Sequence, residues 1–272
     1  MLILKGLIVD KMVNFSVNVE EHIKKEIIKE MYDTGQILTW YRDRPEGWRL
    51  ASGLWSPLYI NERSMPSNPR TFQKAVEALG SMLIGLGYRP YGKDKVVGLA
   101  MAGVPFASAL SAVFGFPALY TRKLPEEVKT GDDVERYIKS HGQHALVEGE
   151  LNHGDRLVMI DDLVTRFDSK LLAMGQINGE LLRRNISGIS MKDIVVLIDR
   201  EQGGAEKAEA CGYGLHSVIR FKSEGLGLLK NSISDIEYSV IAEYLSDGSK
   251  FQNKEIQDRL REAAMKKEIK YP

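Results

Sequence analysis

The sequence predicts an α/β protein with a parallel-sheet core and helices on both faces of the sheet. Short apolar segments alternate with helical patterns or long connections, which is typical of this class. The segments are apolar nearly throughout, as strands covered on both faces are. The predicted strands are residues 95–100, 117–121, 156–160, 193–199 and 215–221. Ligands of such a sheet bind at the carboxyl ends of its strands.

The N-terminal part of the chain contains two predicted helices separated by an irregular region. The first covers residues 17–34, has an amphipathic pattern and ends at Gly35. Residues 36–68 are irregular and rich in Trp, Arg and Pro. The second helix covers residues 69–87, because apolar side chains recur there at helical spacing: Phe72, Val76, Leu79 and Leu83.

The stretch from Val96 to Thr121 carries no charged residue and has the length of a membrane span. Glycine and proline residues divide it into short pieces. We therefore interpret it as a strand, a helix over about residues 105–114 and a second strand in a buried core, and we expect no membrane segment. The dividing residues are Gly98, Gly103, Pro105, Gly115 and Pro117.

Two charged segments fall outside this alternation. Residues 122–147 form a long connection with few apolar residues, which is typical of a lid. Residues 247–272 read as a surface helix or a partly disordered tail. We expect an N-terminal extension over residues 1–16, one main domain over 17–246, and the charged tail.

The composition narrows the function classes. The 272 residues include 37 Lys and Arg and 37 Asp and Glu, so the net charge is zero. Because no global basic field exists, we expect no nucleic-acid and no membrane partner. The single cysteine, Cys211, excludes an intrachain disulfide and a clustered metal site. The apolar N-terminus is too short for a signal peptide and lacks a cleavage pattern, so we expect a cytoplasmic protein.

Residues 156–170 indicate a phosphate–sugar site. An apolar run ends in Asp161 and Asp162, a loop with hydroxyl groups follows, and a helical pattern then begins. The open amides and positive dipole of a helix N-terminus can receive a phosphate. Carboxylates at a strand's carboxyl end can hold ribose hydroxyls, or a metal that bridges phosphates. Taken alone, the acidic pair is equally compatible with a solvated strand end.

A second motif, Asp199-Arg200-Glu201-Gln202-Gly203-Gly204, follows the predicted strand 193–199. An arginine at the carboxyl end of a strand can pair bidentately with a planar carboxylate of a ligand. A structural salt bridge with a neighbouring carboxylate is the alternative.

These motifs resemble those of a known family. The segment up to Thr165 resembles the phosphoribosyl pyrophosphate (PRPP) motif of type I phosphoribosyltransferases. The motif Asp199–Gly204 resembles orotate phosphoribosyltransferases, particularly the domain found in UMP synthases. The resemblance covers about residues 20–245, and further matches agree in order: Ser52–Ile60, Gly98–Ala107, Lys139–Gly142 with Leu146–Gly149, and Leu215–Ser217.

The resemblance implies a type I phosphoribosyltransferase fold with an N-terminal hood and a long flexible catalytic loop. It implies transfer of the phosphoribosyl group from PRPP to orotate, giving orotidine 5′-monophosphate and pyrophosphate. Mg²⁺ would be the cofactor, bound largely by PRPP, so that no metal site is formed by protein side chains alone. The partners would be PRPP, orotate and a second copy of the chain.

The same resemblance assigns roles to individual residues. Asp161 and Asp162 would bind the ribose hydroxyls, while Thr165 and Arg200 would bind orotate. The catalytic residues would be Lys139, His141 and Asp162, with the two loop residues reaching into the partner's site of a homodimer. The residues expected to bind PRPP are Arg122, Lys123, Lys139, His141, Asp161, Asp162, Thr165, Arg166, Phe167, Asp168 and Ser169.

The chain departs from the family in its phosphate loop, where Arg166-Phe167-Asp168 replaces small residues and glycine. A bulky side chain restricts the positive φ angles that glycine permits, and Asp168 adds negative charge. We therefore expect Phe167 to point away from the phosphate, Asp168 to cap the helix and Arg166 to contact the phosphate.

Other departures concern lysines and loop length. Ala51 and Ala102 stand where many members have lysine, and residues 124–138 lengthen the catalytic loop with acidic side chains. Two alternatives therefore remain open. One is a weak or inactive homologue that senses PRPP or a nucleotide as a regulator, and the other is a phosphoribosyltransferase for another acidic base.

Overall fold

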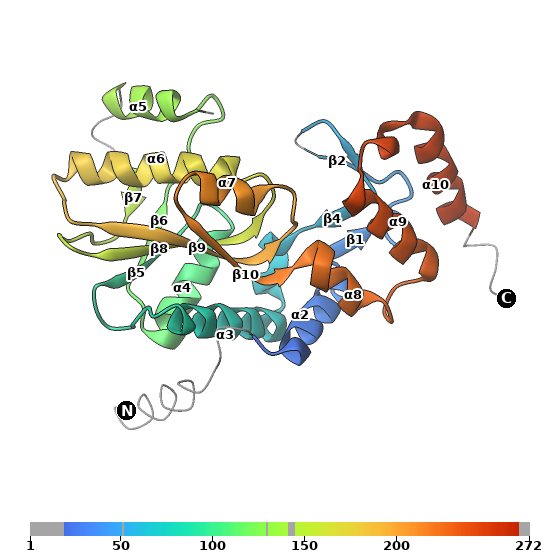
Figure 1. Ribbon diagram of the computed structural model, residues 1–272, viewed down its shortest axis with the longest axis horizontal. Coiled ribbons are helices and arrows are strands. Elements are labelled where there is room, and N and C mark those ends of the chain that lie inside the picture. The colour runs from blue at the N-terminus through green and yellow to red at the C-terminus, as the bar shows by residue number, and fades with distance from the viewer. Residues whose placement is uncertain (1–18, 51, 129, 141–144, 267–272) are drawn as a thin grey trace. The chain divides into compact units, whose positions relative to one another are not determined.

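The structure is a computed structural model that describes residues 19–50, 52–128, 130–140 and 145–266. The chain divides into two compact units (Figure 1). Gln73–Arg220, with the described residues before Glu21, form the first, here called the sheet unit. Glu21–Phe72 and the described residues from Phe221 onward form the second, here called the helical unit.

The sheet unit contains a six-stranded sheet in the order β10-β9-β8-β5-β6-β7. Neighbouring strands are parallel, apart from β7, which is antiparallel to β6. The five strands predicted from the sequence are confirmed, and the fold class with them. Their bounds, with β7 added, are β5 Asp94–Gly98, β6 Ala118–Thr121, β7 Val147–Glu148, β8 Arg156–Val164, β9 Ser190–Asp199 and β10 Gly214–Arg220.

Helices lie on both faces of this sheet, with α4 on one face and α6 on the other (Figure 1). The face under α6 is filled by apolar side chains of β5, β8, β9 and the helix, including Val97, Met159, Ile177 and Ile194. The predicted helices 69–87 and 105–114 are confirmed. The helices are α3 Pro69–Gly85, which begins in the helical unit, α4 Gly103–Phe114, α5 Gly131–Ser140, α6 Asp168–Arg183 and α7 Gly204–Ala210.

Strand β8 is longer than the sequence predicts. Residues 156–160 were expected to form the strand and the acidic pair to follow it, but β8 continues to Val164. It stays paired with β9 from Asp161, opposite Val196, to Val164, opposite Asp199. Backbone groups make this pairing, so it continues past the point where the side chains cease to be apolar. The acidic pair is therefore held inside the sheet.

The segment 122–147 contains a helix that the sequence analysis missed. In α5, Val134 is 1% exposed, and the helix packs on α6 at two glycines. Val134 lies beside Gly175, and a side chain at Gly179 would meet Ile138 Cδ1 at 2.2 Å. Val134 and Ile138 are four residues apart, which is helical spacing. The prediction of a segment without a core pattern is wrong, because acidic residues around these two masked the pattern.

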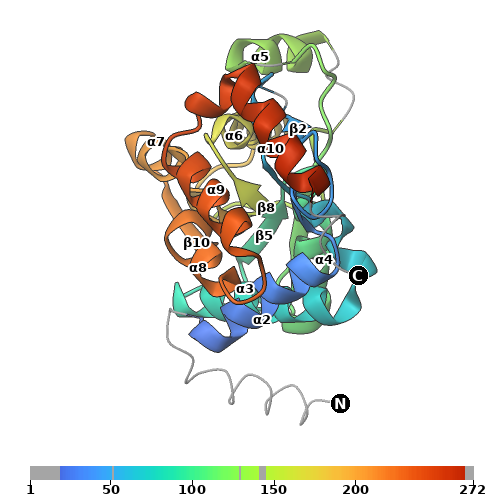
Figure 2. The ribbon, with the colours of Figure 1, turned by 90° about the vertical axis from the view of Figure 1, so that its right-hand side faces the viewer.

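The helical unit joins the described N-terminal residues to the C-terminal ones. Its helix α2 (Glu21–Asp33) confirms the predicted helix 17–34, and α2 lies beside α8 (Leu226–Leu229) (Figure 2). Strand β1 (Ile37–Thr39) pairs with β4 (Leu58–Ile60), and β2 (Trp48–Arg49) pairs with β3 (Trp55–Ser56). The remaining elements are η1 Glu62–Ser67, η2 Phe221–Gly225, α9 Asp235–Ser246, η3 Lys250–Gln252 and α10 Lys254–Lys266.

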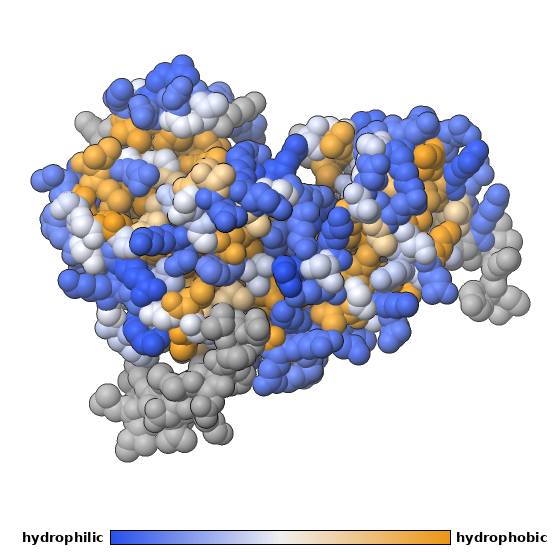
Figure 3. All heavy atoms as spheres, viewed as in Figure 1, coloured by the Kyte–Doolittle hydropathy of each residue, from blue (hydrophilic) through white to orange (hydrophobic). Residues whose placement is uncertain are grey.

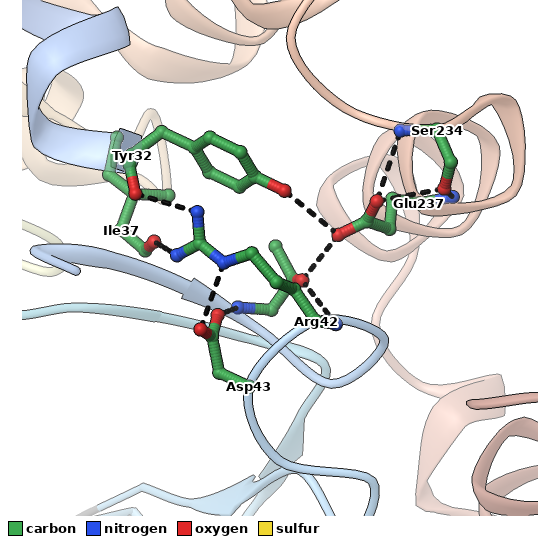
Figure 4. A network of polar contacts seen from close by, with 7 residues as sticks. Tyr32, Ile37, Arg42, Asp43, Ser234 and Glu237 are labelled. Atoms are coloured by element: carbon green, nitrogen blue, oxygen red, sulfur yellow. Dashed lines mark hydrogen bonds and ion pairs between the residues drawn. The ribbon is translucent and has the colours of Figure 1, made fainter. Parts of the chain in front are cut away.

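A buried carboxylate connects the two chain segments of the helical unit (Figure 4). Glu237 of α9 accepts hydrogen bonds from Thr39 Oγ1 at 2.5 Å and from Tyr32 Oη at 3.3 Å. The guanidinium of Arg42 lies 3.7 Å from the ring centre of Tyr32 and donates to the Ile37 carbonyl at 2.8 Å. The charged C-terminal segment is also held, because Trp40 Nε1 donates to the Leu260 carbonyl of α10 at 3.1 Å.

Among the residues that the structure describes, every helix is too short or too polar to cross a bilayer.

Candidate active site

The candidate site is built where β8 and β9 end. The Arg200 amide donates to the Val164 carbonyl at 3.0 Å, so the two strand ends lie side by side. A side chain at Gly204 would meet the Thr165 carbonyl at 2.7 Å, which means that only glycine allows α7 to approach this closely. The structure thus brings together Thr165 and Arg200, the two residues predicted to bind orotate. Arg200 is buried, with 6% exposure.

The loop between β5 and α4 lies against β8 at Ile160 and Asp161. The Leu99 amide donates to the Ile160 carbonyl at 2.9 Å. A side chain at Gly103 would meet that carbonyl at 2.1 Å and the Cα of Asp161 at 3.1 Å. The segment predicted to lie near the pyrophosphate is therefore adjacent to the acidic pair. Ala102 is the N-cap of α4 and brings no cation to this position.

Asp161 does not stand free at the strand end. Its Oδ2 lies 2.8 Å from Nζ of Lys170, and the same Nζ donates to the Leu163 carbonyl at 2.6 Å. Both residues are buried, with exposures of 8% and 4%. Sequence reasoning missed Lys170. A signal existed, because it precedes Ala173, Met174 and Ile177 of the buried stripe of α6 by three, four and seven residues.

Asp162 has a different environment. It is half-buried, and its Oδ1 accepts a hydrogen bond from the Leu163 amide at 2.7 Å. Burial raises the pKa of Asp162 well above the usual range of a carboxyl group, and the negative charge of Asp161 raises it further. The nearby Lys170 ammonium lowers this pKa, but less strongly. The site therefore holds one carboxylate paired with a lysine and a second carboxyl whose pKa is raised.

The helix behind the acidic pair begins in an unusual way. Phe167 is the N-cap of α6 and has left-handed φ and ψ angles of 73° and −4°. This conformation costs roughly 1–2 kcal/mol for a residue with a side chain. Its ring is 1% exposed and lies in the core under α6, and burial of an apolar side chain contributes about 1.5–3 kcal/mol. The ring of Phe167 thus points into the core under α6, and its place relative to a bound phosphate stays a prediction.

Asp168 does not cap α6, so that prediction is wrong. Because Phe167 occupies the N-cap position, Asp168 is the first helical residue, and no side chain caps the helix. Its carboxylate forms an ion pair with Lys207 of α7. The neighbouring Arg166 and Ser169 are exposed.

The basic residues predicted to contact pyrophosphate follow β6, at the same edge of the sheet. The Arg122 amide donates to the Leu146 carbonyl at 3.0 Å, and its guanidinium lies 3.5 Å from Glu148. Both Arg122 and Lys123 are exposed. They lie two strands away from the acidic pair, because β5 separates β6 from β8.

Lys139 is not brought to the acidic pair of its own chain. It lines an apolar groove of about 680 Å³ between α5 and α6, together with Gly179 and Leu182 (Figure 3). About three helical turns, or roughly 16 Å, separate Gly179 from Asp168 at the start of α6. His141, the other predicted loop residue, lies outside the described residues, as does Ala51.

The described residues contain no cluster of three or more His, Cys, Asp or Glu side chains placed to hold a metal. One carboxylate of the acidic pair is already bound to Lys170. The donors of this site therefore do not make a complete Mg²⁺ site by themselves.

Comparison with known proteins identifies the family. No family model matches the chain. It is 33% identical over 200 residues to orotate phosphoribosyltransferase of Pyrobaculum islandicum, covering 73% of this chain and 90% of that protein. The corresponding protein of Pyrobaculum aerophilum is 31% identical over 222 residues, covering 81% and 98%. The chain belongs to the orotate phosphoribosyltransferase family.

Solved structures of orotate phosphoribosyltransferases are similar to this fold. The crystal structure of the Aeropyrum pernix enzyme has a TM-score of 0.56 and 26% identity, covering 76% of this chain and 97% of that one. UMP synthase of Leishmania donovani has a TM-score of 0.63 and 25% identity over 82% of this chain. Only 42% of the UMP synthase chain is covered, so that likeness concerns a part of it.

Proposed function

We propose that this chain transfers the 5-phosphoribosyl group of PRPP to orotate, giving orotidine 5′-monophosphate and pyrophosphate in pyrimidine nucleotide biosynthesis. The observation that carries the proposal is the meeting of Thr165 and Arg200 beside the acidic pair of β8. The uncapped N-terminus of α6 completes this edge with open amides for the 5′-phosphate. Membership of the orotate phosphoribosyltransferase family supports the same substrates.

The chemistry follows from the residue types. Orotate N1 attacks C1 of the ribose and releases its proton to solvent, while the bond from C1 to pyrophosphate breaks and its electron pair leaves with the pyrophosphate. Positive charge develops on the ribose, which a carboxylate at Asp162 stabilises through the ribose hydroxyls. Arg200 binds the carboxylate of orotate through its rigid fork of donors.

Negative charge develops on the leaving pyrophosphate. Arg122 and Lys123 are the cations that this chain places at the same sheet edge. We include Mg²⁺ in the proposal as an ion that arrives bound to PRPP and supplies further neutralising charge. A cytoplasmic location is part of the proposal, as the substrates are soluble metabolites.

The site supports this proposal over a regulator that has lost catalysis. That alternative rests on the altered phosphate loop, but the inward ring of Phe167 leaves the helix N-terminus open. A different acidic acceptor base would use the same Arg200 contact. The acceptor is therefore the point that an experiment must decide.

The test is an absorbance assay with PRPP, Mg²⁺ and orotate, with hypoxanthine and uracil as competing acceptors. We expect turnover with orotate and none with the other bases. Arg200→Ala should raise the KM for orotate far more than that for PRPP. The loss of a desolvated, charge-assisted contact costs on the order of 2–5 kcal/mol. Arg200→Lys is the matched control, because it keeps the charge and removes the fork. Equal effects on both substrates would support a structural salt bridge instead.

We further propose that the chain acts as a homodimer in which Lys139 and His141 serve the partner's site. The distance of Lys139 from its own acidic pair along α6 supports action in trans. Mixing inactive Lys139→Ala and Asp162→Asn proteins should restore part of the activity in hybrid dimers. A monomer by light scattering, or no recovery despite confirmed subunit exchange, would contradict the proposal.

A further inference from the structure

A buried lysine lies behind the acidic pair, and the sequence analysis assigned it no role. Lys170 reaches from the first turn of α6 to β8, where its ammonium contacts both Asp161 Oδ2 and the Leu163 carbonyl, at 2.8 and 2.6 Å. Its side chain is 5% exposed, and that of Asp161 is 12% exposed. An ammonium and a carboxylate are rarely this deeply buried unless each is paired.

Both oxygens of the Asp161 carboxylate are engaged. Oδ2 accepts from Lys170, and Oδ1 accepts from the Asp162 amide at 3.0 Å. In Asp162, by contrast, Oδ1 accepts from the adjacent Leu163 amide, and a side-chain contact with Asp161 raises the pKa of its carboxyl. The two neighbouring carboxylates are therefore unequal before any ligand arrives.

We infer that Lys170 is a positioning residue that holds Asp161 as a fixed, neutralised anion, so that Asp162 alone bonds to the ribose hydroxyls. This inference rests on the proposed function of the site. The two carboxylates then have different roles. Asp161, paired with Lys170, fixes the position of β8, and Asp162 contacts the substrate.

Electrostatics explains why such a lysine is useful here. Two ionised carboxylates beside a polyanionic substrate would repel both each other and the substrate. The ammonium of Lys170 cancels one of these charges without occupying the space of the ligand.

The inference makes a signed prediction about pH. Asp161 of β8 and Lys170 of α6 are the charged groups that act on Asp162, and they act in opposite directions. Removing the lysine should raise the pKa of Asp162 further and move the acid limb of the kcat/KM profile to higher pH. Removing the charge of Asp161 should move that limb to lower pH. A purely structural lysine would move neither.

The chain offers a matched control at the opposite end of the sheet. Lys95 of β5 is also buried, lies 2.8 Å from a buried Asp155 and donates to the Glu150 carbonyl at 2.7 Å. The two ion pairs share burial, geometry and a carbonyl acceptor, but Lys95 is at the amino end of its strand, away from the site. Lys95→Met should lower stability and leave kcat/KM and its pH profile unchanged per folded molecule.

The experiment measures kcat, KM for PRPP and pH profiles for Lys170→Met, Asp161→Asn and the double variant. We expect Lys170→Met to lower kcat/KM about 10- to 100-fold, because a displaced strand end misplaces Asp162. The double variant should regain much of that loss, since no unpaired charge stays buried, and its acid limb should lie below that of Lys170→Met. The double variant also keeps the test valid if Lys170→Met does not fold.

Two outcomes would overturn the inference: a double variant no better than a folded Lys170→Met, or an acid limb that is unmoved in all variants. Calorimetric titration with PRPP separates this inference from the proposed function. If the wild-type protein binds PRPP but does not use orotate, only the proposal that orotate is the acceptor base is refuted. PRPP affinity that is identical in wild type, Lys170→Met and Lys95→Met at every pH would refute the role of Lys170.

Discussion

Helices α9 and α6 begin in opposite ways. At α9, Ser234 accepts from the Glu237 amide, and the Glu237 side chain accepts from the Ser234 amide at 3.0 Å, which forms a complete capping box. At α6, the N-cap is Phe167 in a left-handed conformation, and no side chain caps the helix. The first arrangement satisfies amides of the first turn with side chains, whereas the second has no side-chain cap, and its Lys170 amide donates to the Phe167 carbonyl at 3.0 Å.

The carboxyl groups near these two helix starts, Glu237 and Asp162, also differ in how many hydrogen-bond donors surround them. Glu237 is 3% exposed and receives donors from Tyr32, Thr39 and Ser234. Burial, followed by the charge of Glu237, raises the pKa of Tyr32 to about 12, so this phenol remains a donor at neutral pH. Asp162, in contrast, lies beside another carboxylate, and its ionised form is disfavoured. A carboxylate with many donors stabilises the fold, and one with few is available to a substrate.

The largest expected effect is on stability and comes from removing Glu237, the carboxylate whose hydrogen bonds are supplied by several donors. Glu237→Ala leaves the hydroxyls of Tyr32 and Thr39 buried without their acceptor and removes the capping box. We expect the free energy of unfolding to fall by about 3 kcal/mol, since each buried donor left unsatisfied costs roughly 1–3 kcal/mol. Denaturant titration measures the change, and Glu237→Gln is the matched control with a smaller loss. A Glu237→Ala protein with unchanged stability and lower PRPP affinity would contradict the assignment of Glu237 to the stability of the fold.

The second substitution, Asp162→Asn, tests the carboxyl group whose pKa is raised. We expect kcat/KM to fall on the order of tenfold or more, which corresponds to at least about 1.4 kcal/mol of transition-state stabilisation. The free energy of unfolding of Asp162→Asn should rise, although its kcat/KM falls. Because the folded-state pKa of Asp162 is raised, the native state loses stability as pH rises from the ordinary carboxyl range through the raised pKa.

The asparagine variant lacks this loss. It should therefore be more stable than the wild type at alkaline pH, with a difference that vanishes in acid. Thermal unfolding across pH measures this. Near-normal kinetics in a folded Asp162→Asn protein would remove the acidic pair from the mechanism.

The smallest expected effect concerns the charge at the start of α6. Asp168→Ser should strengthen PRPP binding, because it removes a carboxylate next to the phosphate. The change should be a few-fold, given that charges near a helix terminus contribute about 0.3–1 kcal/mol. Lys207→Met is the control, because it removes the ion-pair partner of Asp168 and should weaken binding instead. Weaker binding by Asp168→Ser would mean that Asp168 supports the loop.

The sequence was sufficient for five strands of the sheet and for helices α3 and α4, because buried strands such as β8 and β9 carry uninterrupted apolar runs. It also located Arg200 after the end of β9, since functional side chains of parallel sheets follow the carboxyl ends of strands, whereas the acidic pair lies inside β8. Helix α5 was missed, because only Val134 and Ile138 mark its buried face among charged neighbours.

Lys170 was overlooked although its spacing places it on the buried stripe of α6. Lysine is mostly a surface residue, so the residue type outweighed the spacing. The conformation of Phe167 was also hidden, because propensity assigns positive φ to glycine, while burial of the ring in this fold outweighs that preference. For Phe167, tertiary packing decides what local pattern cannot.

The central claim is that the uncapped start of α6 and the acidic pair of β8 together bind PRPP. Calorimetric titration of the wild-type protein with PRPP and Mg²⁺ tests it directly, with ribose 5-phosphate and pyrophosphate as partial ligands. We expect saturable PRPP binding that is tighter than that of either partial ligand and is weakened by Asp162→Asn. No binding of PRPP at millimolar concentration, in either wild type or Asp168→Ser, would contradict the claim and leave a phosphoribosyltransferase fold without its original ligand.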